Sequence, residues 1–265
     1  ASIEDIEALN EQLGYNNPFF VRFFNYIKNL IINRNFGTSW RTNRDVMTEV
    51  LARFPVTFRL AAFGVLLATL IGVPIGIVSA VKQYSAVDNI SRVLAMLLAA
   101  FPPFWLGMLM ILLFSVKLGW LPPSSITTPL HYVLPVITIA IPQAASLLRF
   151  SRSTMLETIR QDYIRTARAK GVSDQKITTR HMLKNAMIPI ITVTSIQVGS
   201  MLVGAVLVES VFAMGGLGDL LIKGIKAADY PVVQGVTLLM VFVFLCINLV
   251  VDILYAVLDP RIRMK

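Results

Sequence analysis

Five long apolar runs constrain the fold of this chain more than any other feature of its sequence. A helix needs about 20 mostly apolar residues to cross a bilayer. Backbone polar groups in lipid must be satisfied within the spanning segment, and runs of this length achieve that as helices rather than as strands. The sequence therefore predicts an all-α membrane protein, a polytopic helical bundle. Its spans are expected at about 57–81, 93–116, 130–148, 188–208 and 235–257.

The charged residues predict how this bundle is oriented. Lys and Arg gather in the short loops on the cytoplasmic side of a membrane protein. A basic segment at 161–189 and the basic C-terminal residues fall on one side, together with Lys82 and Arg92, whereas Lys117 and two further lysines fall on the other. The basic segment and the C-terminus are therefore expected in the cytoplasm. The net charge of +9 reflects this arrangement and does not indicate a nucleic-acid partner.

Composition and motifs argue against an enzyme. Hydrophobic residues make up 55% of the chain, too many for an ordinary soluble domain. The sequence contains no G-x-x-x-x-G-K-[ST] loop for nucleotide phosphates, no Cys/His cluster with metal-ligand spacing and no serine in a nucleophile elbow. We therefore expect no catalytic residue, cofactor or metal in this chain. Its one cysteine, Cys246, cannot form a disulfide within the chain.

The predicted spans divide the chain into three parts. Residues 1–53 are expected outside the cytoplasm and contain an amphipathic helix, whose apolar stripe is formed by Phe20, Phe23, Phe24, Ile27, Leu30 and Ile31. Residues 54–258 form the transmembrane domain with its cytoplasmic loop at 151–187, and residues 259–265 form a cytoplasmic tail. Since five spans and a cytoplasmic C-terminus leave Ala1 outside, a sixth, N-terminal span is expected in the complete protein.

Two local patterns predict irregular structure. Pro102 and Pro103 interrupt the second run, and proline removes a helix hydrogen bond and bends the axis. The connection between the last two runs, 209–234, contains a glycine-rich entry at 215–218 that we expect to be flexible, followed by a short amphipathic helix.

The basic segment 161–189 predicts a helix, a glycine break and a second helix. Gly171 is suited to end the first helix in the left-handed conformation. Ser173 is placed to cap the second helix, and Asp174 complements its positive end. Ile164 and Ala167 share a helical face with Gly171, on which small residues allow a partner to approach closely. Such a knob suits docking to another protein, although the residues alone leave open a solvated loop that only obeys the charge rule.

This segment resembles the cytoplasmic coupling loop, or EAA loop, of membrane subunits of ATP-binding-cassette (ABC) importers. The general form is Glu-Ala-Ala, three residues, Gly, nine residues and Ile-x-Leu-Pro, and Ala167, Gly171 and Leu183 match it. The stretch DYIRTARAKG…RHMLKNA…P is similar to the dipeptide/oligopeptide/nickel branch, which departs from the general form in the same way. Five other stretches agree with that branch: NFGTS at 35–39, FWLG at 104–107, GWLP at 119–122, DYPVVQ at 229–234 and DILYAVLDPR at 252–261.

The resemblance implies a type I ABC importer permease in a bacterial or archaeal cell (inner) membrane. It implies a homologous second permease subunit, two cytoplasmic ABC ATPases that bind ATP and Mg, and an extracytoplasmic solute-binding protein, all around a pathway within the lipid bilayer. Peptides are the expected substrate, with nickel or a metal-chelator complex as the alternative. The residues implied to couple to the ATPases are Asp162, Ile164, Arg165, Thr166, Ala167, Arg168, Ala169, Gly171, Ser173 and Leu183.

Polar residues inside the spans are candidates to line the pathway, although such side chains also link helices. They are Gln143, Ser146, Thr194, Gln197, Ser200 and Asn248. Gln197 is the strongest candidate because it lies in mid-span among small residues. Arg149 and Asp252 fall toward the cytoplasmic ends of their spans and are expected to form a structural ion pair. A self-contained secondary transporter or channel is the alternative from another class, but the inverted repeats and midplane ion ligands it requires are not found.

Overall fold

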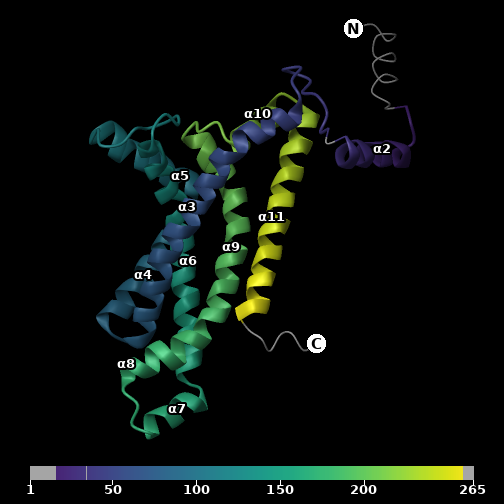
Figure 1. Ribbon diagram of the computed structural model, residues 1–265. Coiled ribbons are helices and arrows are strands. Elements are labelled where there is room, and N and C mark those ends of the chain that lie inside the picture. Colours follow the sequence, from purple (N-terminus) through teal and green to yellow (C-terminus); the bar gives the residue numbers. More distant parts are fainter. Residues whose placement is uncertain (1–15, 34, 259–265) are drawn as a thin grey trace.

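The computed structural model describes residues 16–33 and 35–258, and helices form nearly all of their regular structure. Four long helices stand side by side: α3 (Val46–Val81), α6 (Val133–Ile159), α9 (Leu183–Val211) and α11 (Tyr230–Leu258) (Figure 1). A short 3-10 turn, η2 (Pro129–Tyr132), leads into α6. Within residues 16–33 and 35–258, four helical runs are long and apolar enough to cross a membrane, and a bent pair would make a fifth. The predicted all-α membrane fold is confirmed.

The second apolar run, predicted as a span at 93–116, is broken in the structure. It comprises α4 (Ala86–Ala100), then α5 (Pro103–Met110) continued by a π-helical stretch, η1 (Ile111–Lys117), and the two parts are bent by 97°. Phe101 and Pro102 take extended backbone conformations between them. A residue that precedes proline disfavours the helical region, so two consecutive prolines break the helix as well as bending it.

Small residues bring α3 and α6 into close contact. A Cβ on Gly72 would lie 2.5 Å from the carbonyl oxygen of Ala144, and one on Gly76 would lie 2.5 Å from that of Leu148. Small side chains at such spacing let two helix backbones approach within a membrane. The buried small residues of α3 recur every three or four positions, at Ala61, Gly64, Ala68, Gly72, Gly76 and Ala80.

Helix α9 completes the core, because Gly64 of α3 faces both Ile139 of α6 and Met201 of α9. Helix α11 joins through Gly199 of α9, over which the ring of Phe244 lies. These contacts make α3, α6 and α9 the packed centre, with α11 on one side.

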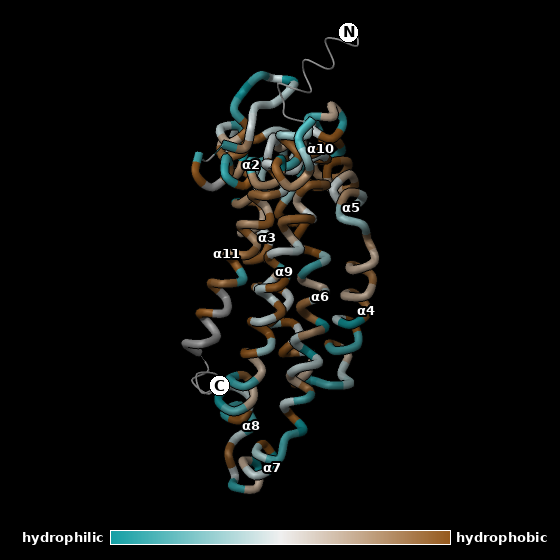
Figure 2. Tube along the Cα trace, turned by 90° about the vertical axis from the view of Figure 1, so that its right-hand side faces the viewer, coloured by the Kyte–Doolittle hydropathy of each residue, from teal (hydrophilic) through white to brown (hydrophobic). Residues whose placement is uncertain are grey.

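The two ends of the bundle differ. At one end α7 (Asp162–Ala169), α8 (Asp174–Lys176) and a π-helical stretch, η3 (Ile177–Met182), project as a knob; at the other lie α10 (Leu217–Lys226) and α2 (Phe19–Ile32) (Figure 1). Hydrophilic residues gather at these ends, and the spans between are mostly hydrophobic (Figure 2). The predicted boundary at 53/54 falls inside α3, and the predicted loop at 151–187 overlaps α6 and α9. The predicted tail, 259–265, lies outside the described residues.

Candidate functional site

The knob contains the glycine turn that the sequence predicts. Gly171 has a φ of +75°. The N–H of Val172 donates to the carbonyl of Ala167 at 3.2 Å, and the N–H of Gly171 donates to that of Arg168 at 2.9 Å. These two bonds form a Schellman motif, in which a left-handed residue ends a helix and turns the chain. Val172 and Ala167 also pack together against the core, so the direction of the turn is fixed.

The prediction that Ser173 caps the second helix is confirmed for its position but not for its side chain. Ser173 does occupy the N-cap position of α8, but its side chain makes no capping hydrogen bond. Ser173 is exposed, so water is available to the first N–H groups of this short helix. Asp174 lies in the first turn as predicted, and its carboxylate also pairs with Arg168 across the glycine turn at 3.5 Å.

The predicted docking face of α7 is corrected by the structure. Ile164 is fully buried and belongs to the main core, and Ala167 packs partly buried against it. Because helix α7 has one apolar face, and the chain's own bundle covers it, that face attaches the knob to the bundle. The exposed face consists of Asp162, Tyr163, Arg165, Thr166, Arg168 and Ala169. Any partner would meet this polar, basic face.

The second half of the knob is continuous with a span. Residues Asp174–Val211 form one helical run of 38 residues, which includes α8, η3 and α9. Ile177 and Met182 are buried where the run enters the core, and Leu183 packs partly buried against it. The knob is therefore fixed to the bundle on both sides, through α6 before it and through α9 after it.

A buried ion pair lies beside the knob and was not predicted. Asp88 of α4 is fully buried, and Arg152 of α6 donates to its two carboxylate oxygens from Nε at 2.6 Å and from Nη2 at 2.8 Å. The hydroxyl of Ser79 donates at 2.5 Å and the N–H of Tyr84 at 3.0 Å. One carboxylate thus joins α3, the α3–α4 turn, α4 and α6.

The predicted pair of Arg149 and Asp252 stays a prediction. Arg149 is exposed on α6, one turn before the half-buried Arg152. The side chain of Asp252 lies outside the described residues.

The predicted pathway residues differ in burial and do not share one environment. Gln197 is buried, and its Oε1 has no hydrogen-bond partner among the described residues. Ser200 is exposed, whereas Gln143 and Ser146 are half-buried. Two others bond to their own helices: Thr194 donates to the carbonyl of Ile190 and Asn248 to that of Phe244, both at 2.8 Å. A pathway role for these six residues stays a prediction.

At the opposite end, two side chains hold the start of α10. Glu209 of α9 is fully buried, and its Oε2 accepts from the N–H of Gly218 at 2.7 Å. The hydroxyl of Thr57 of α3 accepts from the N–H of Leu217 at 2.8 Å. These bonds satisfy N–H groups that a helix start leaves free. A Cβ on Gly216 would collide with the Glu209 carboxylate. Gly216 and Gly218 are therefore closely packed, whereas nothing lies within 4 Å of a Cβ on Gly215; that the entry is flexible stays a prediction.

Two of the stretches that carried the resemblance meet at this end. Asp229, just before α11, accepts from the hydroxyl of Ser39 at 2.5 Å and from the N–H of Trp40 at 3.2 Å. The rings of Trp40 and Tyr230 pack edge to face, with their centroids 5.5 Å apart. The segment before α3 is thereby fixed to the α10–α11 connection.

Sequence analysis missed Asp88, Arg152, Glu209 and Asp229 as structural centres. For Asp88 a signal exists, since Ser85 and Asp88 have the spacing of a helix start, and Ser85 does cap α4. For the partners of these acids no local signal exists, because they lie on other helices or, for Asp229, in the segment before α3.

The comparisons with known proteins agree with this architecture. Residues 72–264 match the family described as binding-protein-dependent transport system inner membrane component. The chain is 41% identical over 265 residues to the glutathione transport system permease protein GsiC of Escherichia coli (strain K12), covering all of this chain and 86% of the relative. It is 42% identical, with the same coverage, to that of Salmonella typhimurium (strain LT2).

Solved structures show the same fold at lower identity. The MetNI methionine ABC transporter in an inward-facing conformation superimposes with a TM-score of 0.66 at 19% identity, covering 80% of this chain and 97% of that chain. An amino acid ABC transporter with histidines gives a TM-score of 0.64 at 14% identity, covering 79% and 94%.

Proposed function

This chain belongs to the family of binding-protein-dependent transport system inner membrane components, the permease components of ABC importers, and we propose that its knob docks on the ATPase subunits of such an importer. The observation that carries the proposal is the division of α7 into two faces. Ile164 anchors one face in the core, and the other presents Tyr163, Arg165 and Arg168 to a partner. Charged residues at the rim of such a contact set its register.

In the proposed mechanism the ATPases bind ATP and Mg and close, and their closure displaces the knob. Because the knob continues into α6 and α9, its displacement moves the packed centre of the bundle. Together with a homologous second permease, this switches the pathway between inward- and outward-facing states. The C-terminus and the knob lie in the cytoplasm, and the α10 end receives substrate from a solute-binding protein.

We propose a short peptide as the substrate. The relatives with the same coverage are permeases of glutathione transport systems, and glutathione is itself a small peptide. ATP-driven uptake into proteoliposomes that contain this chain with its second permease, its ATPases and its binding protein tests this. Uptake of labelled glutathione or of a short peptide is expected. Uptake of nickel alone would assign the chain to the metal substrates of the branch instead, and uptake without ATP would contradict an ABC importer.

Docking is tested by two glycine substitutions with matched local strain. Gly171 and Gly119 have φ values of +75° and +66°, and nothing lies within 4 Å of a Cβ on either. Valine at each position therefore costs the same kind of backbone strain, roughly 1–2 kcal/mol, without a collision. Gly171→Val in the knob should lose ATPase co-purification and ATP-driven uptake. Gly119→Val, which lies in the loop after η1, should retain both. Equal loss in the two variants would show general destabilisation and refute a specific docking role.

A further inference from the structure

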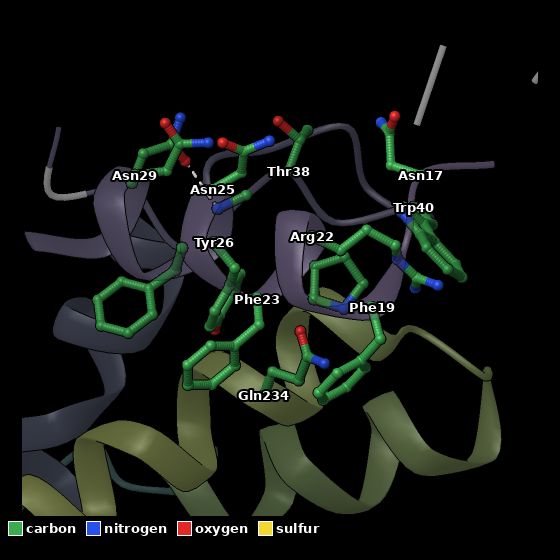
Figure 3. Close-up of a pocket in the computed structure, with 14 residues that line it drawn as sticks. Asn17, Phe19, Arg22, Phe23, Asn25, Tyr26, Asn29, Thr38, Trp40 and Gln234 are labelled. Carbon is green, nitrogen blue, oxygen red and sulfur yellow. Dashed lines mark hydrogen bonds between the residues drawn. The ribbon is translucent and has the colours of Figure 1, made fainter. Parts of the chain in front are cut away.

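A groove of about 620 Å³ separates α2 from the bundle at the α10 end (Figure 3). Helix α2 forms one wall, and residues 35–40 with the first turn of α11 form the other. The rings of Phe19 and Phe23 point from α2 toward Gln234 of α11 (Figure 3). Phe19 remains 70% exposed and Phe23 48% exposed. Both rings therefore face open space on the side of the helix that is turned toward the bundle.

The groove is continuous with the exposed apolar surface of α11. Gln234, Val241 and Leu245 follow one helical face, and Val241 is 49% exposed and Leu245 58% exposed. In a multi-pass inner-membrane protein such a stripe meets lipid or another span. Helix α2 lies beside the upper end of α11, roughly perpendicular to the spans (Figure 1), as an amphipathic helix at a membrane interface does. An acyl chain that lies along this α11 stripe would reach the phenylalanine rings of the groove.

The polar lining of the groove suits a phosphodiester. Among the fourteen described lining residues none is acidic, and Arg22 is the charged one. Amide side chains of Asn25 and Asn29 lie along the rim (Figure 3). The hydroxyl of Tyr26, another lining residue, is buried and has no hydrogen-bond partner among the described residues. A buried hydroxyl without a partner is costly, and a ligand oxygen would satisfy it.

We propose that this groove holds one phospholipid from the bilayer leaflet at the α10 end. Its acyl chain packs against Phe19, Phe23 and the α11 stripe, and its phosphate and ester oxygens accept from Arg22 and Tyr26. The guanidinium binds phosphate in a forked geometry, and no carboxylate among the described lining residues would repel it. The bound lipid fixes α2 to the bundle. This inference does not depend on the substrate or on the ATPase contact.

The first test measures lipid retention. The transporter complex, reconstituted in nanodiscs of phosphatidylethanolamine and phosphatidylglycerol and then transferred to detergent, is examined by native mass spectrometry for one retained phospholipid. Phe23→Asn should lower the occupancy of the retained phospholipid about tenfold, because the acyl-chain contact is lost. A tenfold change corresponds to about 1.4 kcal/mol of binding free energy. Phe24→Asn is the matched control, because Phe24 is 66% exposed on the same helix but does not line the groove. Equal retention in the two variants, or no retained lipid in the parent complex, would overturn the proposal.

A second test identifies the occupant directly. A photo-reactive amino acid in place of Gln234 should give a phospholipid adduct of the permease in membranes. The yield should fall in Arg22→Gln and stay unchanged in Lys28→Gln, which lies on α2 outside the groove lining. An adduct to another subunit or to the binding protein, in place of lipid, would show that a protein segment covers the groove and would reject the lipid site.

Discussion

Replacing Arg152 by methionine is predicted to be among the most destabilising single changes in the bundle. The substitution keeps much of the side chain's apolar length but removes both donors to Asp88, at 2.6 and 2.8 Å. The Asp88 carboxylate is fully buried, so little water can replace the lost donors. Two neutral donors remain, the hydroxyl of Ser79 and the N–H of Tyr84.

The magnitude follows from this burial. Removing one partner of a buried ion pair costs about 3–5 kcal/mol, because the other charge is left uncompensated. The Arg152 side chain is 17% exposed, so some water reaches the vacated place. The expected loss is therefore near the lower limit, about 3 kcal/mol. For a protein of this size 1 kcal/mol shifts the melting temperature by roughly 2–4 °C, which gives a decrease of about 6–12 °C.

Thermal unfolding of the purified complex in one detergent measures this difference. Arg149→Met is the matched control, since Arg149 is exposed on the same helix, and it should change the melting temperature by less than about 2 °C. Adding Asp88→Asn to Arg152→Met should recover much of the loss, because it removes the stranded charge. The argument would be refuted if Arg152→Met had the same melting temperature as Arg149→Met. It would also be refuted if the double variant melted no higher than Arg152→Met alone.

Three further predictions concern helix packing and helix ends. Gly72→Val should destabilise the bundle by about 3 kcal/mol because its Cβ would collide with Ala144, whereas Gly204→Val, where the nearest atom lies 4.0 Å away, should be tolerated; melting temperatures compare them. Asp45 accepts from the hydroxyl and the N–H of Thr48, and these hydrogen bonds lower the pKa of Asp45. Its capping contribution to stability, about 1 kcal/mol, is therefore present above about pH 4 and lost as the pH falls through the lowered pKa. Asp45→Asn should flatten that part of the pH–stability curve. Ala228 has a φ of +52° at the end of α10, so Ala228→Gly should raise stability by about 1 kcal/mol in the same melting assay.

The sequence was sufficient for the four unbroken spans and for the Gly171 turn because local physics determines both. In lipid, the backbone N–H and C=O groups of each apolar run must form hydrogen bonds within that run. A position with a left-handed backbone favours glycine whatever surrounds it. The rotation of each helix about its axis, in contrast, is not determined by local physics. Arg149 and Arg152 are one turn apart, and which one faces inward depends on how closely Gly76 lets α3 approach α6. That contact joins residues far apart in the chain, so no local pattern predicts it.

The same limit explains the correction to α7. Its apolar face was evident from Ile164 and Ala167, but amphipathicity does not indicate whether the cover is the chain's own bundle or a partner. The structure gives that face to the bundle. This attachment favours the transmission of force. A knob that is anchored through its apolar face moves with the core, whereas a knob held only by its two connecting segments would tilt independently of the core.

Continuity along α9 extends this argument to the opposite end. The helical run Asp174–Val211 begins in the knob and contains Glu209, whose carboxylate holds the start of α10. At about 1.5 Å per residue, its 38 residues span roughly 57 Å. Two features soften this rod near the knob: the π-helical η3, and Pro189, which cannot donate to the preceding turn. Bending is therefore expected in the part of the run that contains η3 and Pro189. The segment from Met201 to Glu209 is buried against α3 and α6 and should move as one body with α10.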